Sequence, residues 1–379
     1  MYVGSGGKVN VGGGTLIANG GEKGAGIGRG YDGDSDGSLG ILDEDMIVLG
    51  SDDGEMYCVI AEADGAYTRR MHMKVVPSAA QVGNSKFATV QAAFDAANAG
   101  DTVKLLADAT ADGAITVSKG TEQRPVTLDL NGHGVRMTGS DCVITVNSGA
   151  SLTLTDNATV KPIHKITLTD GRGTAVETVS ALGTDTDNEK YVAGGYITGG
   201  NGTVGGGVYI TSGTVTMNGG TISGNTASST GGVYVGGGTF QVSGAAKVKG
   251  NTAGGTADNV YLPSGKTITV TGALTGGAGA FGVTVVKYEN ASYVQTSGVF
   301  AQAGSRYNGG VLTADNLACF VSDNTAYGVI PADDGKAALA TNVGTWSDLK
   351  TALLTGGYVK LTGDVKYGEG GGDHKTGQL

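Results

Sequence analysis

The feature that most constrains this chain is a repeat of 25 to 27 residues in its middle. Tyr209 recurs as Tyr234 and again as Tyr261, and Ile197 recurs as Ile222. A period of this length is typical of solenoids, in which each repeat is one unit stacked on the next. We therefore expect Tyr209 to lie directly over Tyr234 in the stack, and Ile197 over Ile222.

Each repeat contains three short alternating runs, separated by Gly or Asn; in one repeat they span 208–210, 214–217 and 221–223. Successive strand residues face opposite sides, so one side of each run is apolar. No coil can bury that side alone, whereas a stack forms one continuous core. The pattern predicts an all-β fold, a parallel β-helix with three short strands in each coil. The side chains expected in its core are Val208, Ile210, Val215, Met217 and Ile222.

Gly-Asn pairs at 200–201, 224–225 and 250–251 are predicted to occupy equivalent corners of the coils. Gly and Asn tolerate the positive φ that a tight corner requires. Two interpretations of the asparagines stay open. Asn225 and Asn251 either stack into a polar ladder inside the bend or face solvent as simple turn residues.

Weaker copies of the pattern flank these repeats. The runs 126–132 and 151–155 alternate apolar and polar residues, and the 24 residues from Leu130 to Leu154 again measure one coil. The polar segment 170–192 breaks the period. It is predicted to be an inserted loop that projects from the stack, where binding residues are common.

A helix-and-strand pattern occurs twice. Residues 89–106 and 345–362 align without gaps at an offset of 256. The first part of each predicts a short amphipathic helix that ends at Gly100 or Gly356, and the second part predicts a strand. Such a helix covers the open end of a β-helix and blocks edge-to-edge aggregation.

These patterns predict four segments. Residues 1–38 end a preceding Gly-rich, β-helix-like segment with an acidic loop, and 39–85 form a small β subdomain or linker. Residues 86–343 form a capped β-helix, and 344–379 start a second, truncated one. We expect a piece of a longer array, with further repeats of the same chain on both sides. That would also account for the lack of a signal peptide after Met1.

Composition excludes several classes of function. Gly provides 71 of 379 residues without the G-X-Y period of collagen. The formal net charge of −10 offers no attraction to phosphate, so nucleic acid is not an expected partner. The lack of a run of ~18 apolar residues argues against membrane insertion by this chain. Cys58, Cys142 and Cys319 lack metal-ligand spacing and are expected to be isolated buried thiols.

Three stretches resemble one group of proteins. GGVYITSGTVTMNGGTISGNTA at 206–227 resembles the repeats of large adhesin-like β-helix proteins on Gram-positive gut bacteria. LDLNGHGV at 128–135 resembles the first coil of those proteins and of pectate-lyase-like β-helices, and GAGIGRG at 24–30 resembles a glycine motif of the same surface proteins. The resemblance implies a right-handed β-helix with a short N-terminal capping helix, located outside the cell at its surface. It implies host glycans or host proteins such as immunoglobulins as partners.

The acidic stretch 32–43 is the short motif that most closely matches a known binding pattern. Its oxygen-bearing side chains and its central Gly37 fall where a calcium loop has them. The candidate ligands are Asp32, Asp34, Asp36, Ser38 and Asp43. Position 12 of the loop carries Asp43 in place of a bidentate Glu, and flanking helices are not evident. A structural calcium site and a solvated acidic turn therefore both stay open.

A polysaccharide lyase or glycoside hydrolase acting on acidic or mucin-type glycans is the main alternative to a binding protein. Such enzymes need clustered carboxylates along one groove, whereas the repeat strands carry Thr, Ser, Tyr, Gln and Gly. Asp129 lies in an alternating run with no carboxylate two residues away. His133 and His164 are expected to be exposed turn or loop residues. We therefore predict that the chain is not an enzyme and has no catalytic residue.

Tyr209 and Tyr234 are the candidate binding residues. Facing outward, they would form an aromatic ladder suited to sugars or to a protein partner. Ordinary packing on the strand face, under a loop, is the other interpretation. The sequence as a whole predicts an extracellular, cell-surface adhesin or scaffold module that binds host glycan or host protein.

Overall fold

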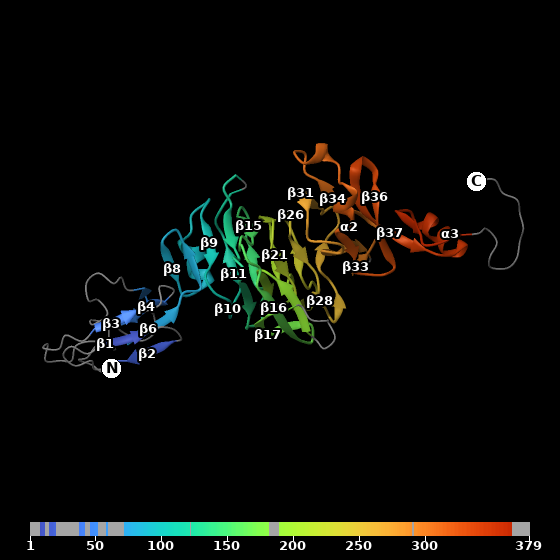
Figure 1. The fold of residues 1–379 in the computed structure, drawn as a ribbon. Coiled ribbons are helices and arrows are strands. Elements are labelled where there is room, and N and C mark those ends of the chain that lie inside the picture. The colour runs from blue at the N-terminus through green and yellow to red at the C-terminus, as the bar shows by residue number, and fades with distance from the viewer. Residues whose placement is uncertain are drawn as a thin grey trace, which may run out of the picture. The chain divides into compact units, whose positions relative to one another are not determined.

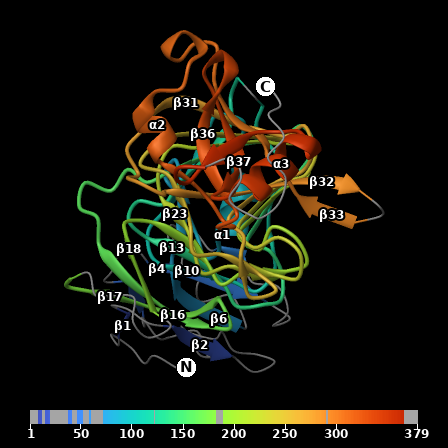
Figure 2. The ribbon, with the colours of Figure 1, turned by 90° about the vertical axis from the view of Figure 1, so that its right-hand side faces the viewer.

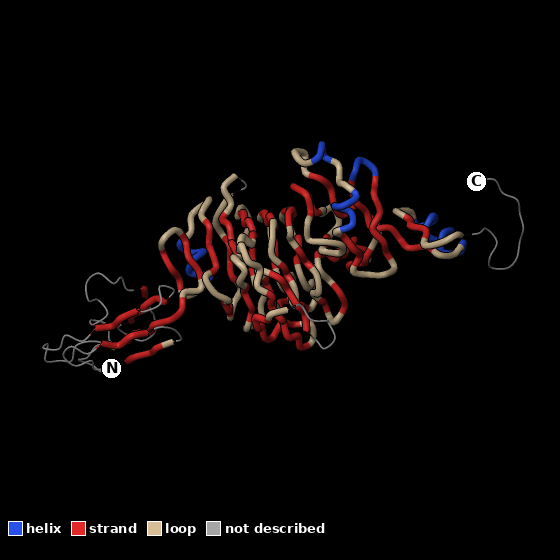
Figure 3. Tube along the Cα trace, viewed as in Figure 1, coloured by secondary structure: helices blue, strands red, loops and turns tan. Residues whose placement is uncertain are grey.

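The computed structural model describes residues 8–11, 15–19, 38–41, 46–51, 58–59, 72–121, 123–181, 189–289 and 292–365. Strands dominate these residues and helices are few and short, as Figures 1 and 3 show, in agreement with the predicted all-β class. None of the described helices is long and apolar enough to cross a membrane. The chain divides into two compact units, Met1–Ala97 with Asp101–Ala109, and Asn98–Gly100 with Thr110–Leu379.

The first unit contains small, mostly antiparallel sheets. One has the order β2 (Leu16–Asn19), β6 (His72–Pro77), β4 (Met46–Ser51) and β5 (Cys58–Val59). A separate pair, β1 (Lys8–Val11) and β3 (Ser38–Ile41), is parallel. In addition, β7 (Ala80–Val82) pairs antiparallel with β8 (Ser85–Phe87) and β9 (Thr102–Leu105), and α1 (Val90–Ala96) contacts all three strands.

Both predicted helix-and-strand elements form, but α1 ends at Ala96 with Ala97 as its C-cap, so the predicted end at Gly100 is wrong. Thr89 caps α1, because its hydroxyl oxygen accepts a hydrogen bond from the Ala92 amide at 3.1 Å. Thr345 caps α3 (Trp346–Thr355) in the same way, and β38 (Val359–Leu361) follows it. The side chain of α1 that packs deepest is Ala93, at 0% exposure.

Three stacks of parallel strands, called here the tyrosine, threonine and third sheets, make up most of the second unit, and the first and the third are joined at one strand. The tyrosine sheet runs β11 (Ile115–Val117), β14 (Ile144–Val146), β21 (Val208–Ile210), β25 (Val233–Val235), β30 (Val260–Leu262) and β32 (Phe281–Glu289). The threonine sheet runs β12 (Val126–Asp129), β15 (Ser151–Thr155), β22 (Thr214–Met217), β26 (Thr239–Gly244), β31 (Ile268–Leu274) and β34 (Gly298–Ala303). The third sheet runs β13 (Gly134–Met137), β19 (Tyr196–Thr198), β23 (Thr221–Ile222), β27 (Lys247–Val248) and the first residue of β32.

The register of these sheets follows the sequence period. Tyr209 pairs with Tyr234, and Ile197 pairs with Ile222, as predicted. One flanking prediction is wrong by two residues, because Leu154 pairs with Leu128 and not with Leu130. Leu130 lies just beyond β12, so counting apolar residues alone misjudged where that strand ends.

The predicted core positions are confirmed. Val208, Ile210, Val215, Met217 and Ile222 are each at most 1% exposed. Because these residues alternate with half-buried polar ones, each strand presents one side to the apolar interior and the other side outward.

The Gly-Asn pairs at 224–225 and 250–251 occupy equivalent corners, as predicted, but the corner one coil earlier lies at 199–200 and not at 200–201. Gly224 and Gly250 have φ of 66° and 69°, and the equivalent residue one coil earlier is Gly199, with φ of 80°. Asn201 pairs with Thr226, one position beyond Asn225, so its predicted equivalence to Asn225 is wrong. Gly200 takes that place instead, because its amide donates to Asn225 Oδ1 at 3.0 Å.

The segment 170–192 belongs to an insertion, as predicted, because Val135 pairs with Ile197, 62 residues on, but the predicted loop is wrong. The segment forms β17 (Arg172–Val179) and β18 (Glu189–Ala193), which flank β16 (Ile163–Thr169) in an antiparallel sheet. Asp170 and Gly171 have φ of 50° and 80° and make the tight turn between β16 and β17. Asp-Gly is a strong hairpin signal, and it decides the structure despite the polar composition.

The C-terminal part of the second unit departs from the parallel pattern. It contains α2 (Ala314–Ala318), β35 (Phe320–Ser322), β36 (Tyr327–Ala332) and β37 (Lys336–Val343). β37 pairs antiparallel with β34 and β36, and parallel with β38. β33 (Ser292–Gln295) pairs with β32 in a hairpin that extends away from the stack in Figure 2.

Candidate binding groove

A groove of about 1040 Å³ lies on the outer side of the threonine sheet. Its floor includes a column of outward side chains that the strand register places one above another: Thr216, Gln241, Thr269 and Gln302. Thr216 Oγ1 donates to Gln241 Oε1 at 3.3 Å, so neighbouring members of the column contact each other. A second column contains Ser151 and Thr214, also in register.

The floor is therefore a regular array of hydroxyl and amide groups. Adjacent strands are roughly 4.8 Å apart, so each column offers a donor or an acceptor at that interval. All four members of the first column are half-buried, which limits their rotamers before any ligand arrives. Such an array suits a long ligand that carries many neutral hydroxyl groups.

One wall of the groove is the segment 304–310, which contains Arg306 and Tyr307. Tyr307 Oη donates to Asn316 Oδ1 at 3.1 Å, and Asn316 is only 1% exposed. Asn316 is held in turn, because its Oδ1 also accepts from the Thr313 hydroxyl in the capping box of α2. The Tyr307 ring is thus fixed at the edge of the floor, and a preorganised ring costs little entropy on binding.

The groove has few charged groups in its lining. Arg306 is the one charged side chain among its described lining residues, and they include no Asp, Glu or His. Glycoside hydrolysis needs two carboxyl groups at a defined separation, and a general base must be within hydrogen-bond reach of its proton. The described lining supplies neither.

The predicted tyrosine ladder lies on the tyrosine sheet and is longer than two residues. The rings of Tyr209 and Tyr234 are stacked, with centroids 5.4 Å apart and an interplanar angle of 20°. Tyr261 continues the column at 5.7 Å, edge to face. All three rings are half-buried, and none lines the groove. The structure brings the candidate residues together, while their role in binding stays a prediction.

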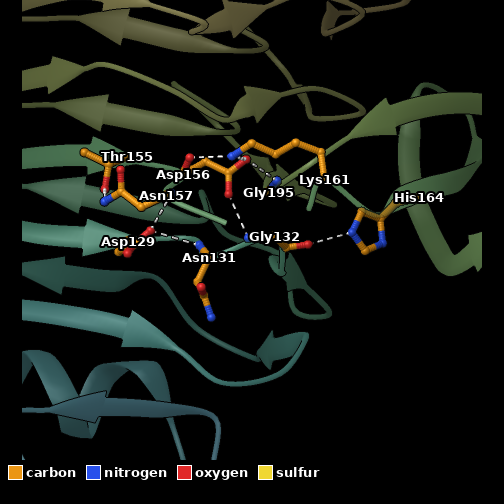
Figure 4. Close-up of polar contacts among 9 residues, drawn as sticks. All are labelled: Asp129, Asn131, Gly132, Thr155, Asp156, Asn157, Lys161, His164 and Gly195. Atoms are coloured by element: carbon orange, nitrogen blue, oxygen red, sulfur yellow. Dashed lines mark hydrogen bonds and ion pairs between the residues drawn. The ribbon is translucent and has the colours of Figure 1, made fainter. Parts of the chain in front are cut away.

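The acid–base candidates lie in a hydrogen-bonded turn structure (Figure 4). Asp129 Oδ1 accepts from the amides of Asn131 and Asn157 at 3.0 and 2.9 Å. The prediction that His164 is an exposed loop residue is wrong, because it lies in β16 at 1% exposure. Its Nε2 donates to Gly132 O at 2.8 Å, and its ring meets Tyr196 edge-on. His133 is half-buried, not exposed as predicted.

Asp156 is the centre of that turn structure and was missed from the sequence. Its Oδ1 accepts from the Gly132 amide at 2.7 Å, and its Oδ2 accepts from the Gly195 amide at 2.9 Å and contacts Lys161 Nζ at 2.8 Å. Burial raises the pKa of the Asp156 carboxyl, but the hydrogen bonds from Lys161 and the two amides outweigh it and hold the pKa below its usual value. The ionised Asp156 carboxylate therefore holds three chain segments together, through two hydrogen bonds and one ion pair.

The side chains of the predicted calcium site all lie outside the described part of the structure. Asp32, Asp34, Asp36 and Asp43 lie outside the described residues, and of Ser38 only its backbone position in β3 is described. Within the described ranges, no group of three or more His, Cys, Asp or Glu side chains could hold a metal ion. A calcium site in 32–43 stays a prediction.

Two of the three cysteines are buried and free, as expected for Cys142 and Cys319. Burial raises the pKa of the Cys142 thiol to about 11, and its Sγ lies 3.0 Å from Thr145 Oγ1. Neither feature suits a nucleophile, because the thiolate is the reactive form. The side chain of Cys58 is outside the described set.

No protein-family model, no curated protein and no solved structure matches this chain. The groove residues were also missed from the sequence, although part of the signal was present. The outward positions of the alternating strands, such as Thr216 and Gln241, follow from the same period that gave the core. Tyr307 lies in a segment without repeats, and only its contact with Asn316 places it at the groove.

Proposed function

We propose that this chain is a glycan-binding module of an extracellular, adhesin-like protein with a right-handed parallel β-helix. The strand pairing supports the solenoid, since residues about one sequence period apart are neighbours in all three parallel sheets. The resemblance of 206–227 to adhesin-like repeats supports the cell-surface location. The ligand site is the groove on the threonine sheet.

The observation that carries this proposal is the composition of that groove. Stacked hydroxyl and amide side chains form its floor, a fixed aromatic ring forms part of its wall, and no carboxylate is among its described lining residues. Sugars present alternating hydroxyl groups and apolar C–H faces. The first match the floor and the second match the ring of Tyr307.

The test is binding and turnover on a panel of purified host glycans. We expect at least one glycan to bind, to raise the melting temperature by mass action, and to remain intact after long incubation. Tyr307→Ala and Gln241→Ala should each weaken that binding by about tenfold, the effect of losing roughly 1.4 kcal/mol. Tyr234→Ala is the matched aromatic control on another face and should bind normally.

Three results would reject the proposal. Release of reducing or unsaturated sugar ends would establish the alternative, a polysaccharide lyase or glycoside hydrolase. Binding that survives Tyr307→Ala but is lost in Tyr234→Ala would move the site to the tyrosine ladder. A host protein captured through that ladder, with no glycan bound, would point to the other partner class expected from the sequence.

A further inference from the structure

A column of asparagines runs through one corner of the stack. Asn225 and Asn251 are 0% exposed, and Asn259 is 6% exposed. Asn225 Nδ2 donates to Asn251 Oδ1 at 2.9 Å, and Asn251 Nδ2 donates to Asn259 Oδ1 at 3.0 Å. The backbone amides of Asn225 and Asn251 donate to the same two oxygens at 3.1 and 2.9 Å. This asparagine ladder decides the open question in favour of a buried polar column.

The ladder ends on a carboxylate. Asn259 Nδ2 donates to Asp323 Oδ1 at 2.6 Å, and the Asn259 amide donates to Asp323 Oδ2 at 2.8 Å. Thr284 Oγ1 donates to the same Oδ2 at 3.0 Å. Asp323 follows β35, two levels beyond Asn259, and it can reach the ladder because Gly282 lies between. A Cβ at position 282 would overlap both Asp323 Oδ1 and Asn259 Nδ2.

A second carboxyl group lies beside this end. Asp258 is 6% exposed, and its Oδ1 has no hydrogen-bond partner in the described structure. The backbone amide of Gly231 is the donor that favours its charged form. Burial, followed by the charge of Asp323, raises the pKa of Asp258 to about 8. Asp323 is the charged group that faces Asp258, whereas the neighbouring Asn259 and Thr284 side chains do not titrate.

The hydrogen-bond donors around Asp323 indicate that a proton, and not a metal ion, neutralises the negative charge of the neighbouring carboxyl group of Asp258. The Asp323 oxygens already face three hydrogen-bond donors, whose polar hydrogens would repel a cation. Calcium takes six to eight oxygen ligands, whereas Asp258 Oδ1 is the one unpaired carboxyl oxygen here. A neutral carboxyl group, by contrast, needs only one proton.

We propose that the buried, unpartnered Asp258 carboxyl keeps its proton in the folded protein, and that this proton holds the C-terminal end of the parallel stack on the asparagine ladder. Burial raises the pKa of Asp323 as well, but the hydrogen bonds from Asn259 and Thr284 oppose that shift, so of the two carboxyl groups Asp323 carries the negative charge. Asp258 carries the proton. When that proton leaves to solvent, two neighbouring like charges repel, and Asp323 with β35 separates from Asn259.

The sign of the pH dependence follows from linkage. An unfolded Asp258 ionises near its ordinary pKa of 3.8, while the folded residue keeps its proton up to about pH 8. Between these values the folded state binds more protons than the unfolded state, so stability falls as pH rises. Above pH 8 the whole contribution is lost.

The test is the melting temperature from pH 5 to pH 9 for the wild type, Asp258→Asn and the exposed control Asp333→Asn. Asn has the shape of the neutral acid, so Asp258→Asn should remove the decline that the wild type shows and should melt higher than the wild type at pH 9. Asp333→Asn should follow the wild type. Amide exchange, corrected for intrinsic rates, should accelerate with pH in β30 and β35 before the rest of the stack.

Three results would overturn the proposal. The first is a melting-temperature difference between the wild type and Asp258→Asn that does not change with pH. The second is stabilisation of the wild type, but not of Asp258→Asn, by millimolar calcium at pH 8, which would make the group a cation site. The third needs no variant: carbon-13 NMR of aspartate-labelled wild type should show one carboxyl group that titrates near pH 8, and its absence would reject the buried proton on Asp258.

Discussion

Asn225 and Asn251 share a hydrogen bond of 2.9 Å between their side-chain amides, although 26 residues separate them in sequence. Each uses its Nδ2 group to reach backbone carbonyls as well, so both hydrogens have acceptors. A buried polar network is favourable only when its members are satisfied. The ladder meets this condition and therefore fixes the register of successive coils.

Removing one member of the ladder should destabilise the second unit. Asn251→Ala leaves Ile222 O without the side-chain donor and the Asn225 side chain without its acceptor. Each buried group left unpaired costs about 1–3 kcal/mol, so we expect a loss of roughly 2–5 kcal/mol. Urea unfolding measures it. The control is Asn201→Ala, which removes an exposed asparagine and should cost under about 0.5 kcal/mol.

Asp156→Asn should destabilise the protein at neutral pH and much less in acid. The pKa of Asp156 is lowered in the folded state, so its contribution is present above its ordinary pKa of 3.8 and is lost as pH falls through the folded pKa. Unfolding by urea at pH 7 and pH 3 gives the comparison. Lys161→Met should cost less, since the amides of Gly132 and Gly195 still bind the carboxylate. If Asp156→Asn lost the same free energy of unfolding at both pH values, the stabilising role of an ionised Asp156 carboxylate would be contradicted.

The duplicated helix-and-strand element provides a matched pair of leucines. Leu105 is 0% exposed in β9, whereas the equivalent Leu361 in β38 is 55% exposed. Leu105→Ala should cost about 2–5 kcal/mol, because it removes buried methyl groups and leaves a cavity. Leu361→Ala should change stability by under about 0.5 kcal/mol. Chemical denaturation of both variants tests the burial directly, and a large loss from Leu361→Ala would show that this side chain is covered.

Cys142 should be inert toward thiol reagents while the protein is folded. Its pKa of about 11 leaves little thiolate at pH 8, and its side chain is 4% exposed. Iodoacetamide labelling followed by peptide mapping should find Cys142 modified only after denaturation. Rapid labelling in the native state would mean that the 142–145 turn opens readily.

The sequence period was sufficient for the parts of the fold that depend on repetition. The pairing of Tyr209 with Tyr234 and the burial of Met217 follow from an apolar pattern that every coil repeats. Turns that occur only once in the chain were harder to predict, because the repeat gives no information about them. Asp170-Gly171 is a hairpin turn signal, but polar composition around it suggested a loop.

Other features depend on contacts between distant segments. His164 is buried because β17 and β18 flank its strand and the Gly132 carbonyl accepts a hydrogen bond from its Nε2, and no local pattern shows either. Tyr307 belongs to the groove because Asn316 holds its hydroxyl. The floor of the groove could be predicted from outward positions, whereas its wall could not.

The hydrogen bonds that join one member of the asparagine ladder to the next all run the same way along the chain, from Gly200 toward Asp323. The column therefore has a beginning and an end. Duplication or deletion of the whole coil between Asn225 and Asn251 would preserve it, since each of these asparagines accepts a hydrogen bond from the member before it and donates one to the next. An insertion of a few residues within a coil would instead shift the next asparagine out of line. Evolution can thus change the length of such a protein in whole coils far more readily than in fractions of one.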